Sequence, residues 1–192
     1  MISLKLENQN NEQINIIIQH FLSGQIIIMP TETVYGLCCI ANNDNAIKKI
    51  YQIKKRDFTK PLTVLVYSID QIKEFAILVN EALHDLEIGN TVILKTKQNN
   101  LSKLVFGDQN PDSIGVRKPN NNIIINLLSQ INQPIVATSV NLSGQQPLVK
   151  IDNLDKQMSQ HIDLIIEGDK ICSGKPSSVI NYCITPPIIL RK

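Results

Sequence analysis

The stretch that decides the fold is Gln25-Ile26-Ile27-Ile28-Met29-Pro30-Thr31-Glu32-Thr33-Val34-Tyr35-Gly36-Leu37. Its first five residues predict a buried strand, which Pro30 ends because proline cannot donate to a sheet ladder. A strand without a polar face is typical of a sheet that helices cover on both sides. The polar residues that follow lie at the carboxyl end of this strand, where open α/β sheets bind ligands. Two hydroxyls, a carboxylate, a phenol and a glycine there favour equally a polar pocket floor and a simple strand-to-loop turn.

The segments around this stretch alternate between helix and strand patterns. Apolar residues at helical spacing predict helices over residues 14–22, from about 44 onward, over 70–79 and over 122–129. Short apolar runs predict strands at 25–29, 62–66, 91–94, 113–116, 135–137, 164–166, 179–180 and 188–190. The strands of the last third are too closely spaced for crossover helices, so some antiparallel pairing is expected. The predicted fold class is therefore α/β, with a mixed parallel and antiparallel sheet flanked by helices.

The composition is that of an ordinary globular protein. Hydrophobic residues make up 43% and charged residues 19% of the 192 positions, without repeats or linkers, so a single domain over residues 1–192 is expected. The net charge of +2 does not indicate a dedicated nucleic-acid binder and suits an anionic small substrate equally well. No apolar run approaches the ~20 residues that cross a bilayer, no export signal is visible, and the four cysteines form no CxxC pair. A cytoplasmic protein with no membrane partner is the prediction.

A cluster of cations follows the second predicted helix. Lys54-Lys55-Arg56 and Lys60 could simply complement the dipole of a helix carboxyl end, which is the more common role of such a run. Lys54 and Arg56 share one side only where the helix has ended and the chain is extended. In that arrangement they would suit a triphosphate, because lysine supplies a point charge and arginine a bidentate fork.

Two further strand ends carry polar residues. After the strand at 135–137, Ser139 and Asn141 would project to one face and offer a hydroxyl and an amide to a phosphate or ribose, or they would only close a turn. Arg117, at the end of the strand at 113–116, could hold a carboxylate bidentately or lie free on the surface. The three histidines show no metal-ligand spacing, so no metal-binding residues are predicted.

Taken together, these segments resemble the YrdC-like family in its single-domain, TsaC-type form. The resemblance runs from about Gly24 to Arg191 and rests on the order and spacing of several short pieces. These are residues 30–37, Lys54-x-Arg56, Lys60-Pro61-Leu62, Gly115-Val116-Arg117, Ser139-x-Asn141-Leu142-Ser143-Gly144, Pro176-Ser177-Ser178-Val179-Ile180 and Ile189-Leu190-Arg191. The chain departs from the family where a Trp-Pro-Gly-Pro stretch is usual, since residues 86–91 read Leu-Glu-Ile-Gly-Asn-Thr. It also has Asp57 in place of the usual proline and Ser177-Ser178-Val179-Ile180-Asn181 in place of Ser-Thr-Val-Val-Asp.

The resemblance implies a twisted, open sheet with a large concave cavity lined by positive charge. It implies that the signature residues Lys54, Arg56, Ser139 and Asn141 hold the nucleotide and act in catalysis, with Lys60 and Arg191 also at the nucleotide. It places a second group near the amino acid: Thr31, Thr33, Tyr35, Arg117, Thr138 and Ser178.

The activity implied by the resemblance is synthesis of threonylcarbamoyl-adenylate and pyrophosphate from ATP, L-threonine and bicarbonate, for threonylcarbamoyladenosine modification of tRNA. Mg²⁺ would accompany the phosphates, and a downstream tRNA-modifying transferase complex would take the product. Two alternatives remain. One is a carbamoyl-adenylate-forming module, and the other is a double-stranded RNA or tRNA binder without catalysis. The mild charge and the scarcity of aromatic residues speak against the second.

Overall fold

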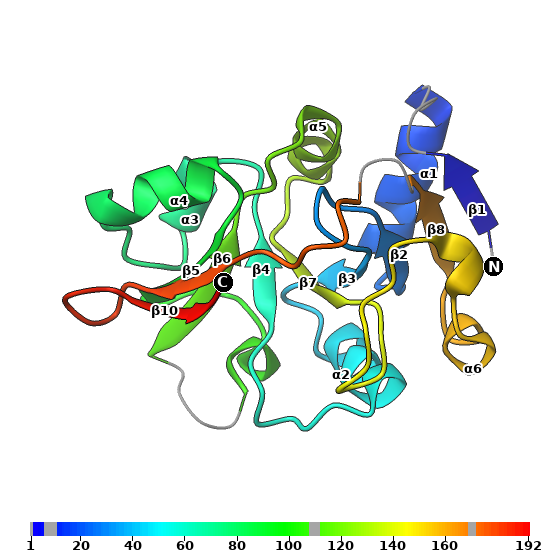
Figure 1. Ribbon diagram of the computed structural model, residues 1–192. Helices are drawn as coiled ribbons and strands as arrows, with labels where there is room; N and C mark the ends of the chain where they lie inside the picture. The colour runs from blue at the N-terminus through cyan, green and yellow to red at the C-terminus, as the bar shows by residue number, and fades with distance from the viewer. Residues whose placement is uncertain (1, 6–10, 108–111, 169–171) are drawn as a thin grey trace.

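The computed structural model describes residues 2–5, 11–107, 112–168 and 172–192. In these residues the strands join into one open sheet whose order is β1-β8-β2-β3-β7-β4-β6-β5-β9-β10 (Figure 1). The strands are β1 (Ile2–Lys5), β2 (Ile27–Met29), β3 (Gly36–Ile40), β4 (Thr63–Leu65), β5 (Thr91–Lys95), β6 (Ser113–Arg117), β7 (Ile135–Ser139), β8 (Leu164–Glu167), β9 (Val179–Asn181) and β10 (Ile188–Arg191).

The sheet mixes parallel and antiparallel neighbours, as predicted. β8 pairs in parallel with both β1 and β2, β4 pairs in parallel with β6, and β5 pairs in parallel with β9. The remaining pairs are antiparallel, and they include β3 with β7 and β4 with β7 at the centre. The sheet is therefore not a simple repeat of βαβ units, because consecutive strands such as β8 and β9 lie far apart in its order.

Six α-helices surround the sheet in the described residues. They are α1 (Asn11–Leu22), α2 (Asp44–Lys54), α3 (Ile69–Ile72), α4 (Leu83–Glu87), α5 (Asn122–Ile131) and α6 (Lys156–Ser159). Asparagine begins two of the longer helices: the side chain of Asn43 accepts from Ala46 N, and that of Asn121 accepts from Ile123 N and Ile124 N. α2 ends at Lys54, and the next residue, Lys55, adopts the left-handed conformation and turns the chain out of the helix.

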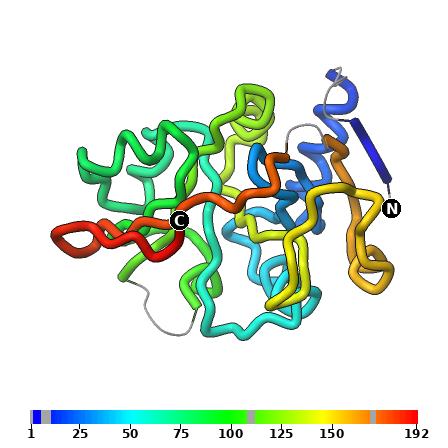
Figure 2. Tube along the Cα trace, in the orientation of Figure 1, coloured from blue at the N-terminus to red at the C-terminus, as the bar shows by residue number. Residues whose placement is uncertain are grey.

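Alternate residues of the central strands enter two separate cores. Ile28, Leu37 and Cys39 pack with the apolar face of α2, whereas Ile27 and Cys38 pack with α1 and α5. Successive side chains of a strand point to opposite faces, so the unbroken apolar run beginning at Ile26 fills both layers. This confirms the prediction of a sheet covered by helices on both faces (Figure 2).

Most of the predicted elements are confirmed, and one is wrong. A helix over 70–79 is absent, because α3 ends at Ile72 and the chain then pairs with the end of β5. Ile77 N donates to Lys95 O, and Lys97 N donates to Phe75 O, so extended pairing replaces the helix. The strands β1 and β3 and the short helices α4 and α6 had no predicted counterpart. No helix in the described part of the chain is long and apolar enough to cross a membrane.

Candidate functional site

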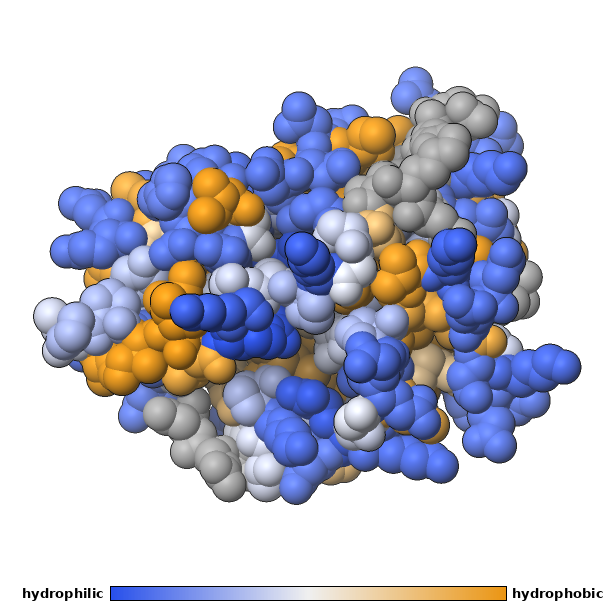
Figure 3. Space-filling view, viewed as in Figure 1, coloured by the Kyte–Doolittle hydropathy of each residue, from blue (hydrophilic) through white to orange (hydrophobic). Residues whose placement is uncertain are grey.

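A cavity of about 230 Å³ lies on the face of the sheet that carries α1 and α5. Its floor includes two small residues on neighbouring strands, Ala137 on β7 and Thr63 on β4, which are paired in the sheet, and Thr63 is also paired with Gly115 on β6. Large side chains at these positions would fill the hollow, so the small ones create the space. The space-filling view shows polar and charged residues around a hollow near the middle of the molecule (Figure 3).

The walls of the cavity come from loops at the ends of the strands. Three arginines of the described chain line it, Arg56, Arg117 and Arg191, and no acidic residue is in the described lining. Hydroxyl groups make up much of the remaining polar lining. Lining residues with a side-chain hydroxyl are Thr31, Thr33, Tyr35, Thr63, Thr91, Thr138, Ser139 and Ser177. Cationic and hydroxyl donors of this kind are suited to an anionic ligand with several oxygens.

The turn between β2 and β3 is both a structured turn and part of the cavity wall. The Thr31 hydroxyl donates to Val34 O at 2.7 Å and accepts from the Thr33 and Val34 amides. Because its one proton goes to Val34 O, the Thr33 hydroxyl donates to Thr31 at 2.8 Å. The Tyr35 hydroxyl accepts from Gly168 N at 2.8 Å, and its ring is fully buried. The two interpretations of this stretch, turn and pocket, are therefore compatible.

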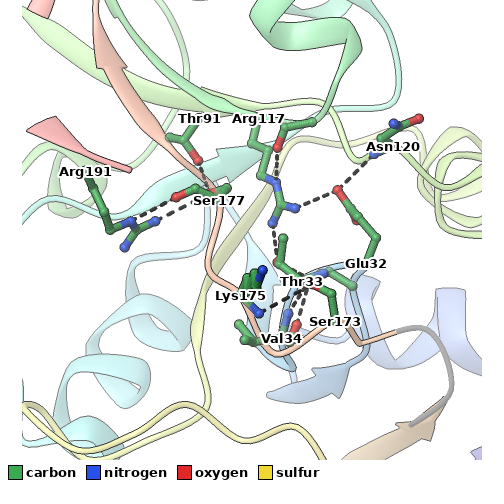
Figure 4. A network of polar contacts seen from close by, with 12 residues as sticks. Glu32, Thr33, Val34, Thr91, Arg117, Asn120, Ser173, Lys175, Ser177 and Arg191 are labelled. Carbon is green, nitrogen blue, oxygen red and sulfur yellow. Dashed lines mark hydrogen bonds and ion pairs between the residues drawn. The ribbon is translucent and has the colours of Figure 1, made fainter. Parts of the chain in front are cut away.

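Arg117 is held at the end of β6 by three partners (Figure 4). Its Nε donates to Gly89 O at 2.8 Å, its Nη1 donates to the Thr33 hydroxyl at 3.0 Å, and its Nη2 lies 2.6 Å from Glu32 Oε1. The residue is 6% exposed. Burial lowers the pKa of Arg117, and the charge of Glu32 opposes that shift. Arg117 is thus not a free surface arginine.

Lys54 is buried beneath the cavity, and it is not part of the lining. It is the last residue of α2, and its Nζ donates to Ser139 O, to Asn141 O at 2.9 Å and to Asn141 Oδ1 at 2.9 Å. The Ser139 hydroxyl donates to the same Oδ1 at 2.6 Å, and Ser143 N donates to Lys54 O at 3.1 Å. Burial, and after it the charge of Arg56, lowers the pKa of Lys54 to about 7. Lys54, Ser139 and Asn141 therefore form one closed unit that joins α2 to β7.

Arg56 lies two residues beyond α2 and reaches the cavity. Its Nη2 donates to Pro61 O at 2.9 Å, and its Nε lies 3.4 Å from Lys60 O. The Lys60 carbonyl thus supports Arg56, while the Lys60 side chain is exposed and outside the lining. Burial lowers the pKa of Arg56, and the group remains a cation at neutral pH.

The segment Cys172–Ser178 crosses from the turn after β2 to β5 and forms a further wall. Ser173 N donates to Glu32 O, Gly174 N donates to Thr33 O, and Thr91 N donates to Ser178 O. The Ser177 hydroxyl lies 2.9 Å from the Thr91 hydroxyl, and Arg191 Nε donates to Ser177 O at 2.9 Å. These contacts appear at the left of the network in Figure 4.

The structure brings most of the predicted site residues to one cavity. In its lining are Thr31, Thr33, Tyr35, Arg56, Arg117, Thr138, Ser139 and Arg191. Outside the lining are Lys54, Lys60, Asn141 and Ser178. Sequence reasoning missed Thr63, Thr91 and Ser177, and it treated the Glu32 carboxylate only as a possible part of the pocket floor, without the ion pair to Arg117. Polar residues inside a strand, such as Thr63, were the available signal.

Comparisons with known proteins identify the family of the chain. A family model described as telomere recombination, covering the Sua5, YciO and YrdC proteins, matches residues 19–192. A Methanocaldococcus jannaschii protein, which has the provisional name of a threonylcarbamoyl-AMP synthase, is 30% identical over 91% of this chain and 82% of its own length. The Bacillus subtilis threonylcarbamoyl-AMP synthase is 30% identical over 88% of this chain, but only 49% of its own length is matched.

Solved structures give the same result. Pyrococcus abyssi Sua5 in complex with L-threonine superposes with a TM-score of 0.85 at 28% identity, covering 99% of this chain and 56% of that one. Escherichia coli YciO superposes with a TM-score of 0.86 at 24% identity, covering 100% of this chain and 94% of that one, and it supports the fold alone. The chain belongs to the Sua5/YciO/YrdC family. It spans about half the length of the Pyrococcus and Bacillus relatives.

Proposed function

We propose that the chain is a threonylcarbamoyl-adenylate synthase, which converts ATP, L-threonine and bicarbonate into L-threonylcarbamoyl-AMP and pyrophosphate. The observation that carries the proposal is one cavity that is lined by Arg56, by Ser139 and by the hydrogen-bonded pair of Thr33 and Arg117. A Sua5 relative of the same fold has been solved with L-threonine. We expect the reaction to take place in the cytoplasm and its product to pass to a transferase complex that modifies tRNA.

The reaction has two balanced steps. The threonine amine condenses with bicarbonate to give a carbamate and water. A carbamate oxygen then forms a bond to the α-phosphorus of ATP, and the bond from that phosphorus to the pyrophosphate oxygen breaks. Such a transfer needs positioning and charge stabilisation and no protein nucleophile. A lining rich in arginine and hydroxyl groups meets this requirement.

Each part of the cavity has a proposed role. Arg56 would stabilise the phosphates, and Ser139 and Asn141, held by Lys54, would hold the nucleotide. Lys60 and Arg191 would add positive charge at the nucleotide end. Arg117 would receive the carboxylate of threonine. The other residues proposed for the amino acid are Thr31, Thr33, Tyr35, Thr138 and Ser178.

ATP would enter as its Mg²⁺ complex. The described residues contain no group of three or more potential metal-ligating His, Cys, Asp or Glu side chains, and the described lining contains no carboxylate. The ion is therefore expected to be held by the phosphates and water and to neutralise their charge. The protein's own contribution is the arrangement of its cations and hydroxyls.

The test is a reaction containing MgATP, bicarbonate and one amino acid at a time, with pyrophosphate release and product mass as readouts. Threonine should give threonylcarbamoyl-AMP without tRNA. Serine lacks one methyl group and should react ~10–200-fold less efficiently. Valine should be worse, because the partner of the threonine hydroxyl is left unsatisfied. Rapid ATP hydrolysis without threonine would contradict the proposal, and a carbamoyl-AMP product would favour the carbamoyl-adenylate alternative.

A further inference from the structure

Glu32 is the one acidic side chain that contacts the cavity cations among the described ion pairs. Its Oε1 takes two hydrogen bonds, from Arg117 Nη2 at 2.6 Å and from Asn120 N at 3.0 Å. The Asn120 contact ties the carboxylate to the loop that follows β6, the strand that ends in Arg117. The carboxylate is therefore fixed relative to the guanidinium on both sides. In Figure 4 Glu32 lies between Arg117 and Asn120.

The space around this ion pair leaves little freedom. Gly89 has a φ of +86°, and a Cβ at that position would lie 2.9 Å from Glu32 Oε1 and 3.1 Å from Asn120 Cβ. Only glycine therefore allows its carbonyl to reach Arg117 Nε while Glu32 occupies the other side. Glu32 Oε2 is buried and has no hydrogen-bond partner among the described residues. A carboxylate left half satisfied costs stability, so its place is not explained by folding alone.

The described hydrogen bonds of Arg117 do not use all of the N–H groups of its guanidinium. A guanidinium has five N–H groups, and the described partners Gly89, Thr33 and Glu32 take three. One N–H on each terminal nitrogen remains, and Arg117 lines the cavity. Two N–H groups on adjacent nitrogens match the two oxygens of a carboxylate.

We propose that Glu32 is a positioning residue that aims the free side of the Arg117 fork at the carboxylate of the amino-acid substrate. This rests on the proposed function, because Arg117 acts there on the amino acid. Glu32 itself touches no substrate, since it is outside the cavity lining. Its influence is selective: it governs the amino-acid end and leaves the nucleotide end, where Arg56 lies, unaffected.

The experiment compares E32A, E32Q and wild type in pyrophosphate release, with KM measured for threonine and for ATP separately. E32A should raise the KM for threonine at least ~10-fold, because a small misplacement of a substrate clamp is costly, while the KM for ATP changes less than about twofold. E32Q keeps an oxygen in place for Arg117 and Asn120 and should recover most of the lost threonine affinity. E87Q is the matched control. Glu87 forms an ion pair of 2.7 Å with Lys118, the residue that follows Arg117 in the sequence, and the Glu87 side chain is exposed.

The outcomes separate this inference from the proposed function. If wild type shows no threonine-dependent turnover, both are wrong. If wild type is active and E32A raises the KM for threonine and the KM for ATP equally, Glu32 has only a structural role. If E32A changes neither KM, Glu32 has no role in catalysis. Failure of E32Q to improve on E32A would likewise overturn the positioning role. Should E32A not fold, E32D takes its place, since it withdraws the carboxylate by one methylene and should give the same selective rise.

Discussion

Arg56 is the residue whose removal should affect the chemistry most. Its guanidinium is anchored by the carbonyls of Lys60 and Pro61, so it enters the cavity in a fixed direction. R56A should lower kcat/KM for ATP by roughly 10²-fold or more, measured by pyrophosphate release, because a preorganised cation stabilises charge that develops at phosphorus. K55N is the control: the exposed Lys55 has a φ of 48°, which asparagine tolerates. Equal activities of R56A and K55N would show that the cations of residues 54–56 only form a solvated helix end.

Lys54 gives a prediction about pH. Its pKa is about 7 in the folded protein against 10.5 ordinarily, so between those values the unfolded chain binds the extra proton. Stability must then rise with pH through this window, by about 1–2 kcal/mol between pH 7 and 8.5. K54M lacks this contribution, so its free energy of unfolding in urea should rise less over the same interval. The comparison stops at pH 8.5 because burial raises the pKa of Cys38 and Cys39, and unfolded thiols ionise above it. Parallel pH profiles for the two proteins would show that Lys54 stays fully charged.

Strand β4 supplies the test of how the cavity is made. Thr63 is in the floor between Ala137 and Gly115, and a leucine there would project into the hollow. T63L should lower turnover at least ~10²-fold by displacing substrate, with a melting temperature within a few degrees of wild type. T63V is the control, since it removes the hydroxyl at almost constant volume. A fully active T63L would mean that substrate does not rest on this part of the sheet.

Elements with strong local signals could be predicted from the sequence, and elements defined by distant partners could not. The buried strand ending at Met29 was predicted because its apolar run has no polar alternation. The helix over 70–79 was wrong because Phe75 and Ile77 pair with a strand twenty positions away, which local periodicity does not record. Strand β3 had no predicted counterpart although Leu37 to Ala41 is an apolar run, because the polar turn before it is typical of a loop.

The site was predictable as a set of residues and not as a set of contacts. Arg117 was named because it ends a predicted strand, and Thr138 was named through the family resemblance; the sheet order brings both to one cavity. The hydrogen-bond partners could not be predicted from the sequence, because Glu32 and Arg117 are 85 positions apart and Lys54 and Asn141 are 87 apart. Lys54 was expected at the nucleotide as a point charge, and its burial under Ser139 was not foreseeable from spacing.

The molecule as a whole has a charge too small to drive nucleic-acid binding. Because 19 lysines and arginines are almost balanced by 17 aspartates and glutamates, and the three arginines line one cavity, the molecule has little excess positive charge with which to track a phosphate backbone. We expect no tRNA or double-stranded RNA shift in gels at micromolar protein and 150 mM salt, and no effect of added tRNA on pyrophosphate release. Binding at that salt that survives R56A would support the RNA-binding alternative.

The order of the sheet also sets a length requirement on the chain. β8 and β9 are consecutive, yet six strands separate them, so the link must cover seven strand spacings, or ~33 Å. It has the eleven residues 168–178 to do so, whose contour length is at most ~40 Å. Loss of two or three residues here would leave the link shorter than the ~33 Å between β8 and β9, whereas insertions would be accommodated. The link of residues 168–178 thus limits how far the two ends of the sheet can move apart.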